Sequence, residues 1–267
     1  ITFDEIRKKH DFVILATGVY KARGLDIPNG KLKGKIAALD YLTASNRLSF
    51  GDRVKEFETG IFNANGKKVV VIGGGDTAMD CVRTAVRQGA TSVKCLYRRD
   101  RANMPGSQRE VKNAEEEGVI FEWLTSPKAL SNELRDPDLL NLEAQEGDLK
   151  GIIVQKMRLG DPDATGRRTP EEIIGSEYLE EADLVIEALG FEPEDLPTLW
   201  DQPDLPVSRW GTIKVEYETG KTNLEKVYAV GDIVRGASLV VWAIKDGRET
   251  ANAILSEIEA TKVIAAE

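Results

Sequence analysis

A strand, a glycine-rich turn and a helix follow one another from residue 68 to residue 89, and this order constrains the fold more than any other feature. The apolar run Lys68–Ile72 predicts a buried strand, and three consecutive glycines follow it. An amphipathic helix is predicted next, from the spacing of its apolar residues Ala78, Val82, Ala85 and Val86. A second strand, Ser92–Tyr97, completes a β-α-β unit of about 30 residues. The sequence therefore predicts an α/β fold with a parallel sheet.

The glycine turn matches the pattern G-x-G-x-x-G/A at the place where that pattern binds dinucleotides. Gly73 would allow the tight turn, Gly75 the close approach of a pyrophosphate, and Ala78 the close packing of helix on strand. The N–H groups around Asp76 and Thr77 would face the anion at the positive end of the helix dipole. A turn that merely connects strand and helix is the weaker alternative, because the whole β-α-β context is present.

The residues after the second strand indicate which dinucleotide is bound. An acidic residue at this place usually accepts hydrogen bonds from the ribose 2′-OH of NAD. Arg98 and Arg99 stand there instead, and two guanidinium groups suit a 2′-phosphate. NADPH is therefore expected in preference to NADH. The alternative is a solvated basic turn, in which Asp100 partly neutralises the arginines.

Three further apolar runs end in glycine, at the position where open parallel sheets bind ligands. The runs are 12–16, 183–189 and 227–230. The residues that follow them are candidate binding residues: Thr17, Gly18, Gly190, Gly231 and Asp232. A helix is predicted over Leu239–Leu255, after the last of these turns.

Other segments carry weaker signals. The sequence Asn-Ala-Asn-Gly at 63–66 indicates a domain boundary near residue 60. Ile1–Lys9 offers little apolar material for a helix, and a strand begins so soon after it that we expect the chain to be a fragment. Ser107 is a candidate helix cap with Glu110 three residues on. Short alternating runs between residues 119 and 186 predict an antiparallel meander or edge hairpins.

Composition excludes several functions. The net charge of −9 argues against a nucleic-acid partner, and no apolar run approaches the roughly 18–20 residues of a membrane helix. The two cysteines, Cys81 and Cys95, have no metal-ligand spacing, so no metal site is expected and a reducing, cytoplasmic location fits. The single histidine, His10, is expected at the surface, and no catalytic side chain is predicted.

Four segments together closely resemble the small (beta) subunits of the bacterial NADPH-dependent glutamate synthases. They are Gly73–Asp80, Tyr97–Arg99, Met104–Ser107 and Gly231–Ile244. The resemblance spans essentially the whole chain and implies a glutathione-reductase-like flavoprotein with two dinucleotide sites. An NADPH domain, residues 61–208, would be inserted in a partial FAD domain, residues 1–60 and 209–267. By the same resemblance Thr17, Gly18 and Asp232 would contact FAD, and N–H groups around Leu239 and Val240 would face the flavin.

The resemblance also implies a reaction and a partner. Hydride would pass from NADPH to FAD, and electrons would reach a large (alpha) subunit that makes glutamate from glutamine and 2-oxoglutarate. Iron–sulfur clusters and the first FAD glycine motif are expected only in an N-terminal region that this sequence lacks. A thioredoxin-reductase-like enzyme is disfavoured, because it would need a C-x-x-C pair in the NADPH domain. Related ferredoxin-type or pyrimidine-reducing electron-transfer subunits remain alternatives, as does a nucleotide-binding and docking module without activity.

Overall fold

A computed structural model describes residues 1–135, 146–164 and 166–264, and the chain forms two compact units. The first unit combines residues 1–22 with 191–267, and the second is continuous from Arg23 to Gly190. The second unit thus lies, along the sequence, between the two segments of the first, and its limits differ from residues 61–208. Residues 23–60 belong to the inserted unit, and residues 191–208 belong to the other.

The inserted unit is built on a parallel sheet of five strands in the order β3-β11-β4-β5-β6. The strands span Lys35–Ala37 (β3), Leu184–Glu187 (β11), Lys68–Ile72 (β4), Ser92–Tyr97 (β5) and Ile120–Trp123 (β6). β4 lies at the centre, and all of its residues after Lys68 are buried. Successive side chains of a strand point to opposite faces, so this apolar run supplies two cores at once.

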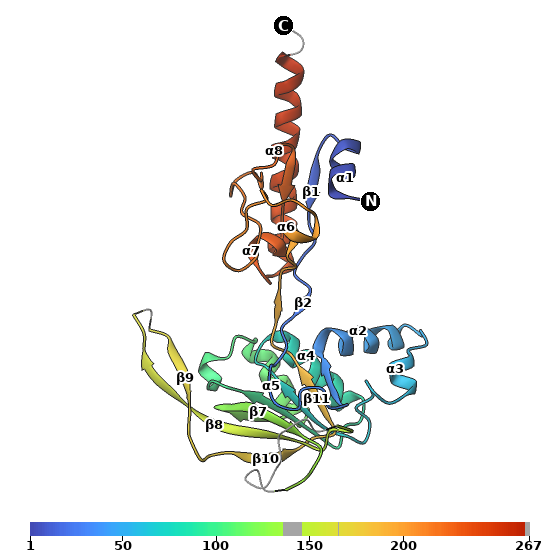
Figure 1. Ribbon diagram of the computed structural model, residues 1–267, viewed down its shortest axis with the longest axis vertical. Coiled ribbons are helices and arrows are strands. Elements are labelled where there is room, and N and C mark those ends of the chain that lie inside the picture. The colour runs from blue at the N-terminus through green and yellow to red at the C-terminus, as the bar shows by residue number, and fades with distance from the viewer. Residues whose placement is uncertain (136–145, 165, 265–267) are drawn as a thin grey trace. The chain divides into compact units, whose positions relative to one another are not determined.

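Helices cover one face of this sheet (Figure 1). The α4 helix (Asp76–Arg87) packs there with α2 (Ala38–Ser49) and α5 (Gln108–Glu116), around Val69 and Val71 of β4. The short helices α3 (Lys55–Glu58) and η1 (Arg101–Asn103) lie in the connections. Residues 23–60 belong to this unit because β3 pairs with β11 and α2 packs on α4, with Tyr41 fully buried.

An antiparallel sheet covers the other face and packs against Val70 and Ile72 of β4. It contains β7 (Thr125–Ser131), β8 (Gly151–Pro162), β9 (Arg168–Glu172) and β10 (Tyr178–Glu181). The predicted antiparallel arrangement is thus confirmed for these four strands. It was wrong for residues 120–123, which form β6 and extend the parallel sheet beside β5.

The other unit holds a parallel pair, β1 (Val13–Leu15) with β13 (Val227–Ala229), and an antiparallel pair, β2 (Lys21–Ala22) with β12 (Phe191–Glu192). Its helices are α1 (Phe3–Lys9), α6 (Leu196–Leu199), α7 (Asp232–Arg235) and α8 (Val240–Ile264). Residues 191–208 belong here because Leu196 and Leu205 are buried in the same core as Val227 and Ile233.

Two local predictions need correction. Residues 3–9 do form a helix, because Thr2 and Glu5 make a capping box and Phe3 stacks on Trp200 with ring centroids 5.1 Å apart. Ser107 occupies the N-cap position of α5, but its side chain makes no cap hydrogen bond, and Glu110 pairs with Arg83 instead. Within the described residues, no helix is long and apolar enough to cross a membrane.

Candidate functional site

In the glycine turn after β4, Gly73 and Gly74 are closely packed against other residues, whereas the space at Gly75 is open. Gly73 has a φ of +148°, and a Cβ there would lie 2.2 Å from the Ala188 carbonyl oxygen. A Cβ on Gly74 would lie 2.4 Å from the ring of Tyr97. A Cβ on Gly75 would meet nothing within 4 Å. The turn therefore leaves free space at Gly75, beside the start of α4.

The N-terminus of α4 presents backbone donors next to that space. Gly75 is the N-cap, and its carbonyl accepts the N–H groups of Ala78 and Met79. The N–H groups of Asp76 and Thr77 precede these first helical hydrogen bonds, so they are available to an anion. Ala78 is fully buried and allows α4 to lie close to the sheet. The Asp76 carboxylate accepts the Ser107 N–H at 2.9 Å and so holds the loop before α5.

The three arginines after β5 have different environments. Arg98 is exposed, and within the described residues no hydrogen bond or ion pair to its side chain is found. Arg99 is half-buried and donates from Nη2 to Asn103 Oδ1 at 2.8 Å. Arg101 is paired with both carboxylate oxygens of Glu115, at 2.8 and 2.9 Å. The sequence could not distinguish these roles, because a run of arginines does not show where its partners lie in space.

The end of β11 lies beside the glycine turn, because β11 pairs with β4 and Ala188 contacts Gly73. Gly190 has a φ of +84°, and its carbonyl accepts the Arg23 N–H at 3.0 Å. Glu187, which the sequence analysis did not single out, is buried at this end of the strand. Its Oε1 accepts the Leu25 N–H at 2.9 Å and the Lys35 ammonium at 3.1 Å.

In the other unit, the parallel pairing of β1 with β13 brings two predicted turns to the same edge. Thr17 and Gly18 follow β1, and Gly231 and Asp232 follow β13. Thr17 is exposed and Asp232 is half-buried, whereas Gly18 and Gly231 have φ values of +70° and +73°. Carboxyl ends of adjacent parallel strands are where such sheets bind ligands.

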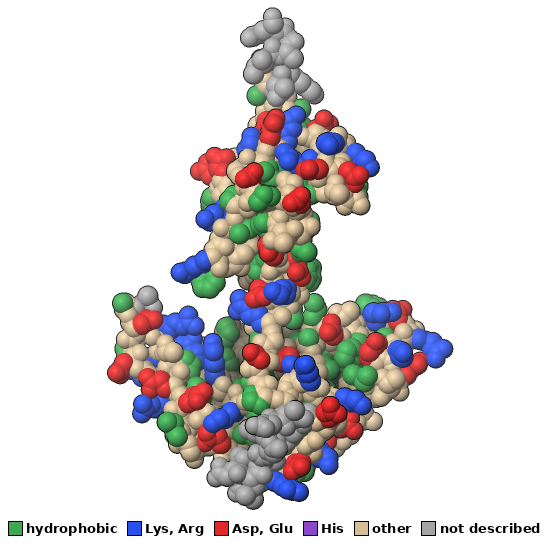
Figure 2. All heavy atoms as spheres, viewed as in Figure 1, with side chains coloured by type: hydrophobic (Ala, Val, Ile, Leu, Met, Phe, Trp, Pro, Cys, Tyr) green, Lys and Arg blue, Asp and Glu red, His purple; other side chains and the backbone are tan. Residues whose placement is uncertain are grey.

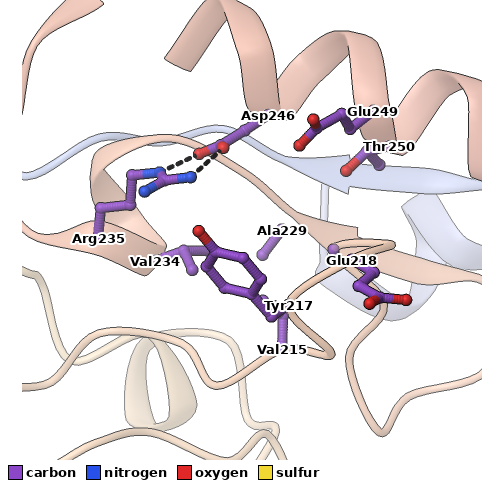
Figure 3. Close-up of a pocket in the computed structure, with 10 residues that line it drawn as sticks. Val215, Tyr217, Glu218, Ala229, Val234, Arg235, Asp246, Glu249 and Thr250 are labelled. Carbon is purple, nitrogen blue, oxygen red and sulfur yellow. Dashed lines mark hydrogen bonds and ion pairs between the residues drawn. The ribbon is translucent and has the colours of Figure 1, made fainter. Parts of the chain in front are cut away.

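An ion pair fixes the Gly231 turn to α8 (Figure 3). Arg235 donates from Nε and Nη2 to the two carboxylate oxygens of Asp246, each at 2.6 Å, and Gly231 N–H donates to the same carboxylate at 3.3 Å. The bond from Arg235 holds the pKa of Asp246 below its usual value. The cavity between this pair and Tyr217 measures about 40 Å³, which is room for water but not for a cofactor.

The start of α8 exposes a run of apolar side chains close to the same turn. Leu239 and Val240 are 64% and 71% exposed, and the Arg235 guanidinium lies over the Trp242 ring, 5.4 Å from its centroid. Exposed apolar side chains that follow one another, as at the start of α8, are typical of a binding surface.

The remaining reactive side chains lie away from these turns or are inaccessible. Cys81 and Cys95 are buried free thiols, and burial raises the pKa of Cys95 to about 12. His10 is exposed at the end of α1. Within the described residues no cluster of metal-ligating side chains is found. Acidic and basic side chains are interspersed over the face drawn in Figure 2.

Comparison with known proteins agrees with this architecture. The sequence pattern of the pyridine nucleotide-disulphide oxidoreductases matches residues 4–247. The chain belongs to this family. It is 63% identical over its whole length to a putative glutamate synthase [NADPH] small chain of Cereibacter sphaeroides, and spans 61% of that protein.

A second relative and a solved structure are also similar to this chain. Over 98% of the chain, identity is 56% to the glutamate synthase [NADPH] small chain of Azospirillum brasilense, of which the chain spans 53%. The structure of Mycobacterium tuberculosis FprA in complex with NADPH superposes with a TM-score of 0.74 at 20% identity, over 99% of this chain and 67% of that one. The chain thus spans between half and two thirds of the length of these two small chains, and the likeness to FprA concerns the fold.

Proposed function

We propose that this chain is part of an NADPH-dependent flavoprotein, the small subunit of glutamate synthase. The subunit would transfer hydride from NADPH to FAD and relay electrons to a large subunit that forms glutamate from glutamine and 2-oxoglutarate. The observation that carries the proposal is the open glycine turn of the inserted unit, followed after β5 by an exposed arginine instead of an acidic residue. The identities of 63% and 56% to glutamate synthase small chains support the choice of reaction.

The inserted unit has the features that NADPH requires. Free space at Gly75 allows a pyrophosphate to approach the backbone, and the N–H groups of Asp76 and Thr77 would donate to it. Arg98 would bind the 2′-phosphate with charge-assisted hydrogen bonds. Gly190 follows Ala188, which contacts Gly73 beyond the end of β11, and Gly190 would line the same site.

The other unit has the features of one side of an FAD site. Thr17, Gly18, Gly231 and Asp232 lie at the carboxyl ends of β1 and β13, where Asp232 would hydrogen-bond the ribityl or pyrophosphate region. The N–H groups at the start of α8, around Leu239 and Val240, would be fixed dipoles directed at the flavin. Fixed dipoles stabilise developing negative charge without reorganisation.

The chemistry itself belongs to the cofactor: a bound flavin accepts hydride and releases single electrons. The protein's own residues would bind and orient, and none is assigned as an acid or base. The buried thiols of Cys81 and Cys95 are protonated at neutral pH, which also argues against a disulfide-reducing reaction of this pair.

The large glutamate synthase subunit is the partner that this function implies. A related subunit that passes electrons from NADPH to a ferredoxin-type partner would share the same two sites, and a nucleotide-binding docking module would share the first. If NADPH oxidation depends on the large subunit, the chain is a glutamate synthase subunit and not a ferredoxin-type subunit. Bound flavin distinguishes both of these from a docking module.

Calorimetric titration with NADP⁺ and NAD⁺ in parallel, with the visible spectrum recorded, tests the nucleotide assignment. We expect preferential NADP⁺ binding, and failure of both nucleotides to bind would remove the proposal. NADPH oxidation by a full-length small subunit that contains this chain, in the presence of the large subunit, then tests the reaction. The rate should require both glutamine and 2-oxoglutarate, and a rate independent of both would contradict the glutamate synthase assignment.

A further inference from the structure

Asn103, at the end of the short helix η1, makes hydrogen bonds with both its side chain and its backbone in the loop after β5. Its Oδ1 accepts from Arg99 Nη2 at 2.8 Å, and its backbone carbonyl accepts the Tyr97 hydroxyl at 3.0 Å. Its N–H and Nδ2 both donate to Asp100 Oδ1, at 2.9 and 2.6 Å. Asn103 therefore connects Tyr97, Arg99 and Asp100 through hydrogen bonds.

This loop is also attached to the glycine turn. The ring of Tyr97 covers Gly74 so closely that a Cβ there would lie 2.4 Å away. Gly106 N–H donates to the Gly74 carbonyl at 2.8 Å, and Ser107 N–H donates to Asp76 at 2.9 Å. The position of Asn103 is thus fixed relative to the turn at which a dinucleotide would bind.

The partners of Arg99 and Arg101 differ in charge, so the two arginines differ in how well they can bind an anion. Glu115 neutralises Arg101 through two hydrogen bonds. Asn103 accepts a hydrogen bond from Arg99 but carries no charge, so it orients the guanidinium without cancelling its positive charge. A free arginine side chain loses conformational entropy when it binds an anion, whereas a side chain that is already held in place has lost that entropy before a ligand arrives.

We propose that Asn103 is a positioning residue for 2′-phosphate recognition, acting through Arg99. It orients the Arg99 guanidinium without pairing it with a carboxylate, next to the exposed Arg98 in the sequence, whereas Arg101 takes no part because Glu115 neutralises it. The proposal rests on the proposed NADPH site and adds to it the residue that sets the preference for NADPH over NADH.

A double-mutant cycle measured by calorimetry tests this proposal on the present chain. Asn103→Ala should weaken NADP⁺ binding roughly tenfold and NAD⁺ binding less than about twofold, since only the 2′-phosphate contact is affected. In an Arg99→Ala background, Asn103→Ala should cause no further loss of NADP⁺ affinity. In an Arg98→Ala background, its effect should persist.

Two further variants serve as controls. Arg101→Ala removes one positive charge from the same turn and should leave the ratio of NADP⁺ to NAD⁺ affinity within about twofold of the unsubstituted chain. Asn103→Asp retains an acceptor for Arg99 but neutralises its charge, so NADP⁺ affinity should fall at least as far as in Asn103→Ala. The NAD⁺ affinity of each variant reports whether the nucleotide site remains folded.

Equal losses for the two nucleotides in Asn103→Ala, or a full additional loss in the Arg99→Ala background, would overturn the positioning role while leaving the NADPH site intact. Unchanged NADP⁺ affinity in Asn103→Asp would overturn it too. If the unsubstituted chain shows no preference for NADP⁺, the proposed function fails first and the role of Asn103 fails with it.

Discussion

Two alanine substitutions in the glycine turn, at Gly73 and at Gly75, should have different effects. The first should lower the stability of the fold, and the second should weaken nucleotide binding. Gly73→Ala would force a side chain into a backbone with φ of +148° and place its Cβ 2.2 Å from the Ala188 carbonyl oxygen. The positive φ costs about 1–3 kcal/mol, and relieving the clash by moving the strand end costs about 1–3 kcal/mol more. We expect the free energy of unfolding to fall by about 2–6 kcal/mol, a large part of the stability of a typical domain.

Gly75→Ala should leave the fold nearly unchanged and weaken the binding of both nucleotides. The Cβ would meet nothing within 4 Å, and Gly75 has a φ of −92° that alanine adopts freely. The less favourable N-cap costs roughly 0.5–1 kcal/mol, offset in part by the lower entropy of the unfolded chain, so the net change stays below about 1 kcal/mol. The new methyl group would occupy the space that the pyrophosphate needs, weakening both NADP⁺ and NAD⁺ by about tenfold or more.

Urea unfolding measures the first effect of each substitution, and calorimetric titration of the folded protein measures the second. The reasoning would be refuted if Gly75→Ala bound NADP⁺ as tightly as the unsubstituted chain. It would also be refuted if the two variants lost similar amounts of stability, because the structure gives them opposite environments.

Three further variants test other parts of the structure. Arg98→Ala combined with Arg99→Ala should weaken NADPH binding by roughly 1.5–3 kcal/mol for each charge-assisted hydrogen bond lost, with little change for NADH; equal losses in titrations with the two nucleotides would contradict the 2′-phosphate assignment. Asp246, whose pKa is lowered by Arg235, should stabilise its unit above the unfolded-state pKa of about 3.9 and lose that contribution as pH falls toward the lower folded-state value. Asp246→Asn should reduce the acid sensitivity seen in urea unfolding between pH ~7 and ~3, and an unchanged pH dependence would show that the ion pair contributes little. Glu187→Gln should lower the stability of the inserted unit by about 1–3 kcal/mol, because the buried carboxylate pairs with Lys35; an unchanged urea midpoint would argue against a stabilising role.

The β-α-β unit could be predicted closely because its signals are local. Period and turn chemistry identify β4, the turn and α4, and the buried face of α4 includes Ala78, Val82 and Ala85 as predicted. The domain boundaries could not be predicted as well. Whether β3 joins β11 is decided by pairing across about 150 residues, and no local pattern in Lys35–Ala37 shows it.

For the candidate binding residues too, local sequence indicates some properties and only the folded structure shows the others. Gly73 and Gly75 are indicated by their spacing, yet only the packing shows that a Cβ is blocked at the first and unopposed at the second. Arg98, Arg99 and Arg101 look alike in sequence, and their partners Asn103 and Glu115 distinguish them. Tyr97 and Gly106 lie in the segments that carry the family resemblance, but their contacts with Gly74 were visible only in the fold.

The sequence by itself determined the α/β class, the glycine turn and the two arginines directly after β5, because each depends on residues close together along the chain. The tertiary structure alone decided which residues share a unit, which arginine stays unneutralised and which turns meet at one edge. Those properties depend on strand pairing and side-chain contacts between distant segments. A linear pattern records the residues available for such contacts, and the packing of the folded chain selects among them.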